Sequence, residues 1–166
     1  LLKDNKVFFR SITIKELAIK TRKFLVKNCG DLDLHMVGRF PFNSCETTAL
    51  LLGKAIKNLY PSKEVLFVDG NCKNGKGRHF WIEVDELCFD LTADQFKNIK
   101  LPFFGVAINQ HSQFFSSSSK VDIEIQFENN DFYTSKVEQF DLYIKNITST
   151  LNGTKTVGYV SLRSTL

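Results

Sequence analysis

The pattern of apolar and polar positions predicts three amphipathic helices. The first begins at Thr13, which forms a capping-box pair with Glu16, and it ends near Gly30. The second runs from about residue 44 to residue 59, and its buried side is formed by Leu52, Ala55, Ile56 and Leu59. The third begins near Ser135, and its apolar stripe consists of Val137, Phe140, Ile144, Ile147 and Leu151.

Short apolar runs between turn residues predict strands at 64–69, 79–84 and 87–92, and strict alternation predicts another at 121–127. The glycine-rich segment 70–77 is predicted to be a polar loop, and Ser116–Ser119 an exposed turn. No internal repeat or domain boundary interrupts these elements. Residues 1–166 are therefore expected to form a single α+β domain.

Composition and charge narrow the function classes. The chain of 166 residues is 43% hydrophobic and 24% charged, which is typical of a globular domain. The net charge of +4 is modest, and no arginine-rich run points to nucleic acid. No apolar stretch approaches the ~20 residues that span a bilayer. We expect neither a nucleic-acid nor a membrane partner, and the sequence does not indicate an oligomeric state.

Four cysteines and three histidines are present, and no cysteine pair has CxxC spacing. This composition argues against a metal site, and no cofactor is expected. The simpler interpretation of the four cysteines is a cytoplasmic protein in which the thiols are reduced. The chain does not begin with Met, which is compatible with a fragment of a longer protein.

The chemistry-bearing residues follow one another in a suggestive order. Cys45 lies at the start of the second predicted helix, His79 opens a predicted strand, and Asp90 lies in the next strand. A thiol at a helix start is activated because unpaired N–H groups and the helix dipole favour its anion. An imidazole takes the thiol proton, and a carboxylate orients the imidazole. Cys45, His79 and Asp90 are therefore the candidate catalytic residues.

A hairpin geometry connects His79 to Asp90. If the turn is Asp85-Glu86, Val84 faces Leu87, and His79 and Asp90 become diagonal neighbours on one face, with Cβ atoms roughly 7 Å apart. One hydrogen bond then closes the gap. If the register differs, Asp94 becomes the alternative orienting acid.

The other cysteines and histidines are weaker candidates for the nucleophile and the base. A lone cysteine near an apolar helix is more often a small core residue than a nucleophile. Even so, Cys29, Cys72 and Cys88 fit a nucleophile less well than Cys45, since they lie at a helix end, in a loop and within a strand. His35 and His111 have no comparable carboxylate geometry.

Oxyanion and substrate contacts can also be assigned to candidates. The backbone N–H of Cys45 is the first candidate oxyanion donor, and the side chain of Asn43 is preferred over that of Gln95 as the second. Trp81, which shares the face of His79, is a further candidate for substrate binding.

Residues 38–96 resemble the transglutaminase-like branch of the papain-like cysteine enzymes. The segments His79-Phe80-Trp81-Ile82-Glu83-Val84-Asp85 and Phe89-Asp90-Leu91-Thr92-Ala93-Asp94-Gln95-Phe96 carry the resemblance. It implies a nucleophile helix packed on an antiparallel sheet, with Cys45 as nucleophile, His79 as base and Asp90 as orienting acid. Ser44 departs from the family pattern, the loop at 70–78 is short, and no calcium-site pattern is present.

The combined expectation is cysteine-dependent acyl transfer on amide bonds, through a thioester intermediate. Hydrolysis of a protein or peptide substrate, by a peptidase, amidase or deamidase, is favoured because no acceptor-amine signature is visible. The alternatives are transglutaminase-type cross-linking and a non-catalytic binding module of the same fold.

Overall fold

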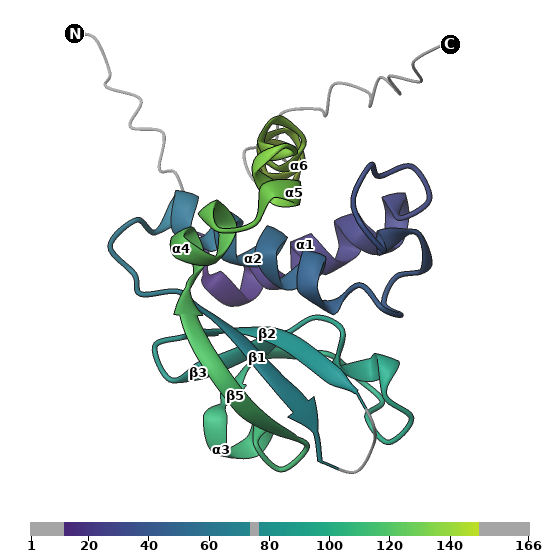
Figure 1. Cartoon of the computed structure of the whole chain (residues 1–166), viewed down its shortest axis with the longest axis vertical. Helices are drawn as coiled ribbons and strands as arrows, with labels where there is room; N and C mark the ends of the chain where they lie inside the picture. The colour runs from purple at the N-terminus through teal and green to yellow at the C-terminus, as the bar shows by residue number, and fades with distance from the viewer. Residues whose placement is uncertain (1–11, 74–76, 150–166) are drawn as a thin grey trace, which may run out of the picture.

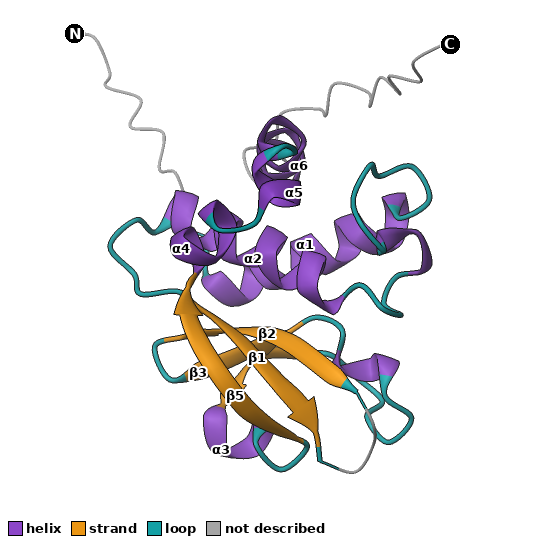
Figure 2. Ribbon diagram, in the orientation of Figure 1, coloured by secondary structure: helices purple, strands orange, loops and turns teal. Residues whose placement is uncertain are grey.

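The fold is α+β, with helices gathered on one face of an antiparallel sheet (Figure 1, Figure 2). The computed structural model describes residues 12–73 and 77–149. The sheet has five strands in the order β4-β3-β2-β1-β5. Their bounds are β1 Leu66–Cys72, β2 Arg78–Val84, β3 Leu87–Asp90, β4 Phe103–Ala107 and β5 Phe115–Asp122. Every pair of neighbouring strands is antiparallel.

The longer of the described helices are α1 Ile14–Asn28, α2 Cys45–Leu59 and α6 Val137–Ser149. The short ones are α3 Ile108–His111, α4 Ile123–Glu128 and α5 Asp131–Thr134, with single 3₁₀ turns at Val37–Arg39 and Ala93–Gln95. Along the described chain, α1 and α2 precede the strands, α3 lies between β4 and β5, and α4, α5 and α6 follow β5. α1, α2, α4, α5 and α6 lie on the same side of the sheet, and α3 lies on the other (Figure 2).

Two apolar clusters enclose the sheet. The larger fills the layer between the helices and the sheet, and includes Leu50 and Ile56 of α2 together with Phe80 and Ile82 of β2. α2 packs closely there, since a Cβ added at Gly53 would lie 2.6 Å from the side chain of Ile123. The smaller cluster includes Trp81, Cys88 and Phe115 on the opposite face. The alternation along β2 thus separates Phe80 and Ile82 from Trp81, as period-2 geometry requires.

The first two predicted helices are confirmed. Thr13 and Glu16 form the reciprocal capping box at the start of α1. α2 spans the predicted residues, but Leu59 was wrongly placed on its buried side, because it is 39% exposed at the last turn.

The end of the chain differs from the prediction in two places. Ser116–Ser119 is not a turn but lies within the edge strand β5. The predicted strand at 121–127 is also wrong, because β5 ends at Asp122, whose carboxylate caps α4 through Glu124 N–H. Ile123 and Phe127 are buried at i and i+4, whereas Ile125 between them is 52% exposed. Burial therefore follows the helical period rather than the alternating one.

The third helix begins two residues later than predicted. Ser135 ends α5, and its hydroxyl donates to the carbonyl of Phe132 instead of capping α6. In the predicted stripe, Phe140, Ile144 and Ile147 are buried, Val137 is 42% exposed, and Leu151 lies outside the described residues.

Candidate active site

Cys45 is the first residue of α2 and is half-buried. The first bond of the helix runs from Thr48 N–H to the Ser44 carbonyl, so the backbone N–H groups before Thr48 precede the intrahelical ladder. Ser44 occupies the N-cap position, but its hydroxyl donates to the Pro41 carbonyl and does not cap the helix. The helix start thus leaves N–H groups beside the thiol that can stabilise negative charge.

The β2–β3 hairpin brings His79 and Asp90 together as predicted. Val84 pairs with Leu87 and Ile82 with Phe89, so the predicted register is confirmed. Asp85 and Glu86 form the two-residue turn with φ of 49° and 63°. Positive φ at both central residues gives the twist that suits a tight hairpin.

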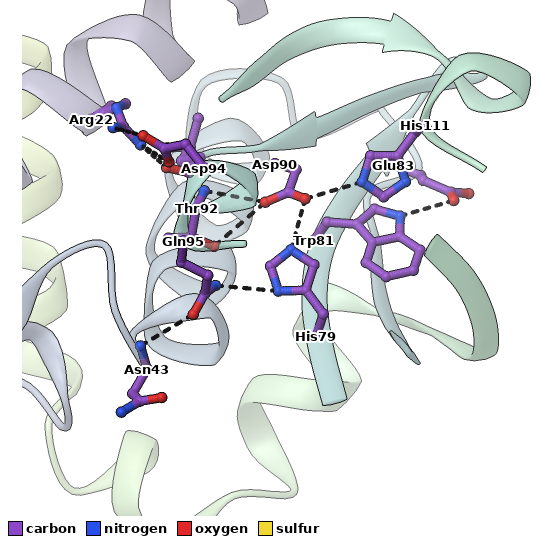
Figure 3. Close-up of polar contacts among 11 residues, drawn as sticks. Arg22, Asn43, His79, Trp81, Glu83, Asp90, Thr92, Asp94, Gln95 and His111 are labelled. Carbon is purple, nitrogen blue, oxygen red and sulfur yellow. Dashed lines mark hydrogen bonds and ion pairs between the residues drawn. The ribbon is translucent and has the colours of Figure 1, made fainter. Parts of the chain in front are cut away.

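The carboxylate of Asp90 is the centre of a buried polar cluster (Figure 3). Its Oδ2 lies 2.7 Å from Nε2 of His79 and 3.0 Å from Nε2 of His111. Its Oδ1 accepts the backbone N–H of Thr92 at 3.1 Å and the Thr92 hydroxyl at 3.4 Å. His79 is 0% exposed, and Asp90 and His111 are each 1% exposed. The three side chains form a His-Asp-His cluster with the carboxylate in the middle.

The position of His111 corrects the expectation that it lacks a carboxylate partner. It lies in α3, directly after β4, and shares with His79 the same oxygen of Asp90. Segment 93–120 shows no clear periodicity, so no strand register could be predicted for His111. A weaker signal was available, since a histidine flanked by Phe103 and Phe114 in an aromatic-rich segment is often buried and hydrogen-bonded.

Aromatic rings enclose the His-Asp-His cluster. The Phe115 ring lies 4.6 Å from the His79 ring and 4.7 Å from the His111 ring, measured between centroids. Phe96 meets His79 edge-on at 4.9 Å, and Trp81 lies 4.6 Å from His111. These walls exclude water, which strengthens the electrostatic interactions inside.

Gln95 connects the loop before Cys45 to His79. Its Oε1 accepts the backbone N–H of Asn43 at 3.2 Å, and its Nε2 lies 3.4 Å from Nδ1 of His79 (Figure 3). The amide orientation is set by this pairing, because a backbone N–H can only donate. Gln95 therefore presents its NH₂ group to the imidazole nitrogen that Asp90 leaves free.

The side chains of Asn43 and Trp81, predicted to contact the oxyanion and the substrate, do not face an open site beside His79. The Asn43 side chain is exposed and directed away from His79 (Figure 3), and the residue has a φ of 57°. Trp81 is 2% exposed, and its indole N–H donates to Glu83 at 3.1 Å. The amide of Gln95 thus faces His79 and the side chain of Asn43 does not, and Trp81 is a buried wall of the cluster.

Asp94 is engaged elsewhere. Its two carboxylate oxygens accept from Arg22 of α1 at 3.0 and 2.6 Å, and Arg22 also donates to the Leu91 carbonyl. Both side chains are 18% exposed. The pair ties the segment that follows Asp90 to α1, which fixes the turn that carries Gln95.

The protonation states in the cluster follow from burial and from charge pairing. Burial by itself disfavours the His79 cation, but the charge and hydrogen bond of Asp90 outweigh it, and the Cys45 side chain adds to them. Together they raise the pKa of His79 to about 9. Burial also opposes the Asp90 anion, yet His79 and His111 hold the pKa of that carboxyl well below its usual range. The cluster thus favours an imidazolium beside a carboxylate.

This pairing predicts that folding stability falls as pH rises from about 6.5 to 9. Below 6.5, His79 is protonated in both the folded and the unfolded chain, and the pairing contributes fully. Between 6.5 and about 9 only the folded chain retains the proton, so the contribution is progressively lost. One pKa unit corresponds to about 1.4 kcal/mol, which gives a decrease of about 3 kcal/mol. Urea unfolding at graded pH measures it; the dependence should flatten in His79→Gln, and an unchanged slope in that variant would contradict the assignment.

Comparisons of the chain with protein-family models, curated proteins and solved structures find no match. Among residues 12–73 and 77–149, no group of three or more His, Cys, Asp and Glu side chains is arranged to hold a metal ion. Within the same ranges, every helix is too short or too polar to cross a membrane. The assignment of function therefore rests on the geometry of the site.

Proposed function

We propose that the protein is a cysteine hydrolase that cleaves amide bonds in a protein or peptide through a thioester on Cys45. The observation that carries this proposal is a half-buried thiol at the first residue of a long helix, which helps to raise the pKa of a buried imidazole. Nε2 of that imidazole is bound to a buried carboxylate. This arrangement has the order and roles that the transglutaminase-like resemblance implies, and the papain-like character of the fold is part of the proposal.

The first half of the reaction forms the thioester. The Cys45 thiol gives its proton to Nδ1 of His79, because Nε2 is occupied by Asp90. The thiolate attacks the amide carbonyl carbon, and the carbonyl oxygen gains the negative charge. The backbone N–H of Cys45 and the NH₂ group of Gln95 are the donors proposed for this oxyanion. His79 then returns the proton to the leaving nitrogen, the C–N bond breaks, and an amine departs.

The second half releases the acid. His79, now neutral at Nδ1, takes a proton from water, and the resulting hydroxide attacks the thioester carbonyl. The C–S bond breaks, the thiolate is regenerated beside the imidazolium, and a carboxylic acid leaves. If an amine replaces water in this step, the same site performs cross-linking, which is the alternative.

Gln95 has a proposed role that depends on the protonation of His79. Its N–H can donate to Nδ1 only while that nitrogen carries no proton. When Nδ1 accepts the thiol proton, two N–H groups face each other, and the amide of Gln95 is released. In the thiolate–imidazolium pair that the raised pKa of His79 favours, the amide of Gln95 is therefore free to donate to the oxyanion.

The proposal predicts that iodoacetamide labels Cys45 selectively at pH 6 to 7. Cys29 and Cys72 are also half-buried, but of the three thiols it is Cys45 that acts on the pKa of His79. Burial raises the pKa of the Cys88 thiol to about 12, and the charge of Glu83 adds to this, so Cys88 should remain unlabelled in the folded protein. Peptide mapping after short labelling times measures each site. Equal, slow labelling of Cys45, Cys29 and Cys72 would support the non-catalytic alternative.

A further inference from the structure

The proposed mechanism does not use His111, although its side chain contacts the carboxylate of Asp90. Thr92 fixes Oδ1 through its N–H and hydroxyl. Within residues 12–73 and 77–149, Oδ2 has two hydrogen-bond partners, Nε2 of His79 and Nε2 of His111. Without His111, the only group holding Oδ2 would be the imidazole that Asp90 itself has to orient.

We propose that His111 is a positioning residue, whose Nε2–H holds the Asp90 carboxylate in the orientation that presents Nδ1 of His79 to Cys45. This inference rests on the proposed function of Cys45 and His79, and assigns a role to a side chain outside that triad. The contact comes from α3, an element on the opposite side of the sheet from α2 (Figure 2). It therefore fixes Asp90 from outside the hairpin that carries His79.

The hydrogen bonds require defined tautomers. A carboxylate only accepts, so each Nε2 that contacts Asp90 must carry a proton. With its proton on Nε2, neutral His79 has a free lone pair on Nδ1, which is the form that takes the thiol proton. His111 donates to the same oxygen in its neutral or its cationic form, and thereby keeps Asp90 an acceptor.

The surroundings of His111 indicate that its polar contact is specific. The ring is stacked on Phe115 at 4.7 Å and lies 4.6 Å from Trp81 and 5.5 Å from Phe103, measured between centroids. A phenylalanine could make similar aromatic contacts, but it could not donate to Asp90. Burying a polar ring without such a bond is costly.

Two substitutions separate the hydrogen bond from the packing. His111→Gln keeps an amide N–H near the position of Nε2, whereas His111→Phe keeps the aromatic contacts and removes the donor. We expect His111→Phe to lower the Cys45 alkylation rate at pH 6.5 by about tenfold, and His111→Gln to stay within about threefold of the wild type. His35→Gln, at an exposed histidine, is the matched control. Equal rates in all variants, or equal losses in His111→Phe and His111→Gln, would overturn the proposal.

If His111→Phe does not fold, His111→Asn takes its place, because its shorter amide does not reach the position of Nε2. The Cys45 alkylation rates of His111→Asn and His111→Gln are then compared. Equal rates in all variants, or equal losses in these two, would overturn the proposal.

A second measurement is independent of thiol reactivity. In a Cys45→Ala background, the proton on Nε2 of His79 should be visible in NMR spectra of ¹⁵N-histidine-labelled protein, since the ring is buried and hydrogen-bonded. His111→Phe should broaden or lose this signal through exchange, and His111→Gln should retain it. A signal unchanged in His111→Phe would refute the positioning role. The proposed function is tested separately: it is wrong if the alkylation rate of Cys45 is the same in the wild type and in His79→Gln.

Discussion

Replacing His79 by glutamine is expected to slow the alkylation of Cys45 at pH 7 by about 30-fold. Glutamine keeps an N–H that can donate to Asp90, but has no atom that accepts the thiol proton. An ordinary thiol has a pKa of roughly 8.5, and only a few per cent of it is ionised at pH 7. The variant should recover reactivity as pH rises toward 9, whereas the reactivity of the wild type should depend less on pH over this range.

The matched control for this prediction is again His35→Gln. His35 is exposed, and its side chain contacts Phe132 rather than the His-Asp-His cluster. It should leave the alkylation profile unchanged. Identical profiles for the wild type and His79→Gln would mean that the imidazole does not act on the thiol.

Asp90→Asn should produce the second large effect, on reactivity and on stability together. Two N–H groups face Oδ2, and the Thr92 N–H and hydroxyl face Oδ1. Asparagine has one carbonyl oxygen, so its NH₂ group must face a donor on one side or the other. Either a buried donor loses its partner, or His79 changes tautomer and turns an N–H toward Cys45.

The size of this effect follows from the burial of the cluster. An unsatisfied buried polar group costs about 1 to 3 kcal/mol, and we expect a loss of about 2 kcal/mol in the free energy of unfolding. The Cys45 alkylation rate at pH 6.5 should fall by about tenfold or more, because an asparagine cannot stabilise the imidazolium. Urea unfolding and the alkylation profile measure the two effects.

Asp94→Asn is the matched control for Asp90→Asn. It breaks the charged pair with Arg22 and should reduce stability, but it leaves the carboxylate of the cluster in place. Its alkylation profile should therefore keep the wild-type shape. If Asp94→Asn removes reactivity and Asp90→Asn does not, Asp90 is not the orienting acid.

The hairpin shows why part of the candidate site could be predicted from the sequence. The turn at Asp85-Glu86 links β2 to β3, which are neighbours in the sequence. The period of two in a strand then determines which side chains share a face. The pairing of Val84 with Leu87 then brings His79 to Asp90 across only 11 residues. Local rules are sufficient for such a contact.

His111 and Gln95 illustrate what local rules leave out. His111 reaches Asp90 from α3 across 21 residues, through a segment in which neither helical nor strand periodicity is clear. Gln95 contacts Asn43 across 52 residues, and its position depends on the Arg22–Asp94 pair that holds its turn. Both contacts depend on how separate elements pack.

The predictions for segment 116–127, a turn followed by a strand, were wrong for a different reason. Four serines in β5 belong to the edge strand of the described sheet, where polar side chains are tolerated because they are exposed to solvent. The alternation after Val121 also satisfies a short helix, because Ile123 and Phe127 are four residues apart. Tertiary packing, with Ile123 against Gly53 of α2, selects the helix.

Formation of a thioester on Cys45 can be followed by pre-steady-state reaction with p-nitrophenyl acetate. We expect a burst of p-nitrophenolate, an acetyl group mapped to Cys45 and removed by neutral hydroxylamine, and loss of both in Cys45→Ala. The burst should also be slower in His79→Gln. If Cys45 carries no acetyl group, or if Cys29 and Cys72 are acetylated at the same rate as Cys45, Cys45 is not the nucleophile.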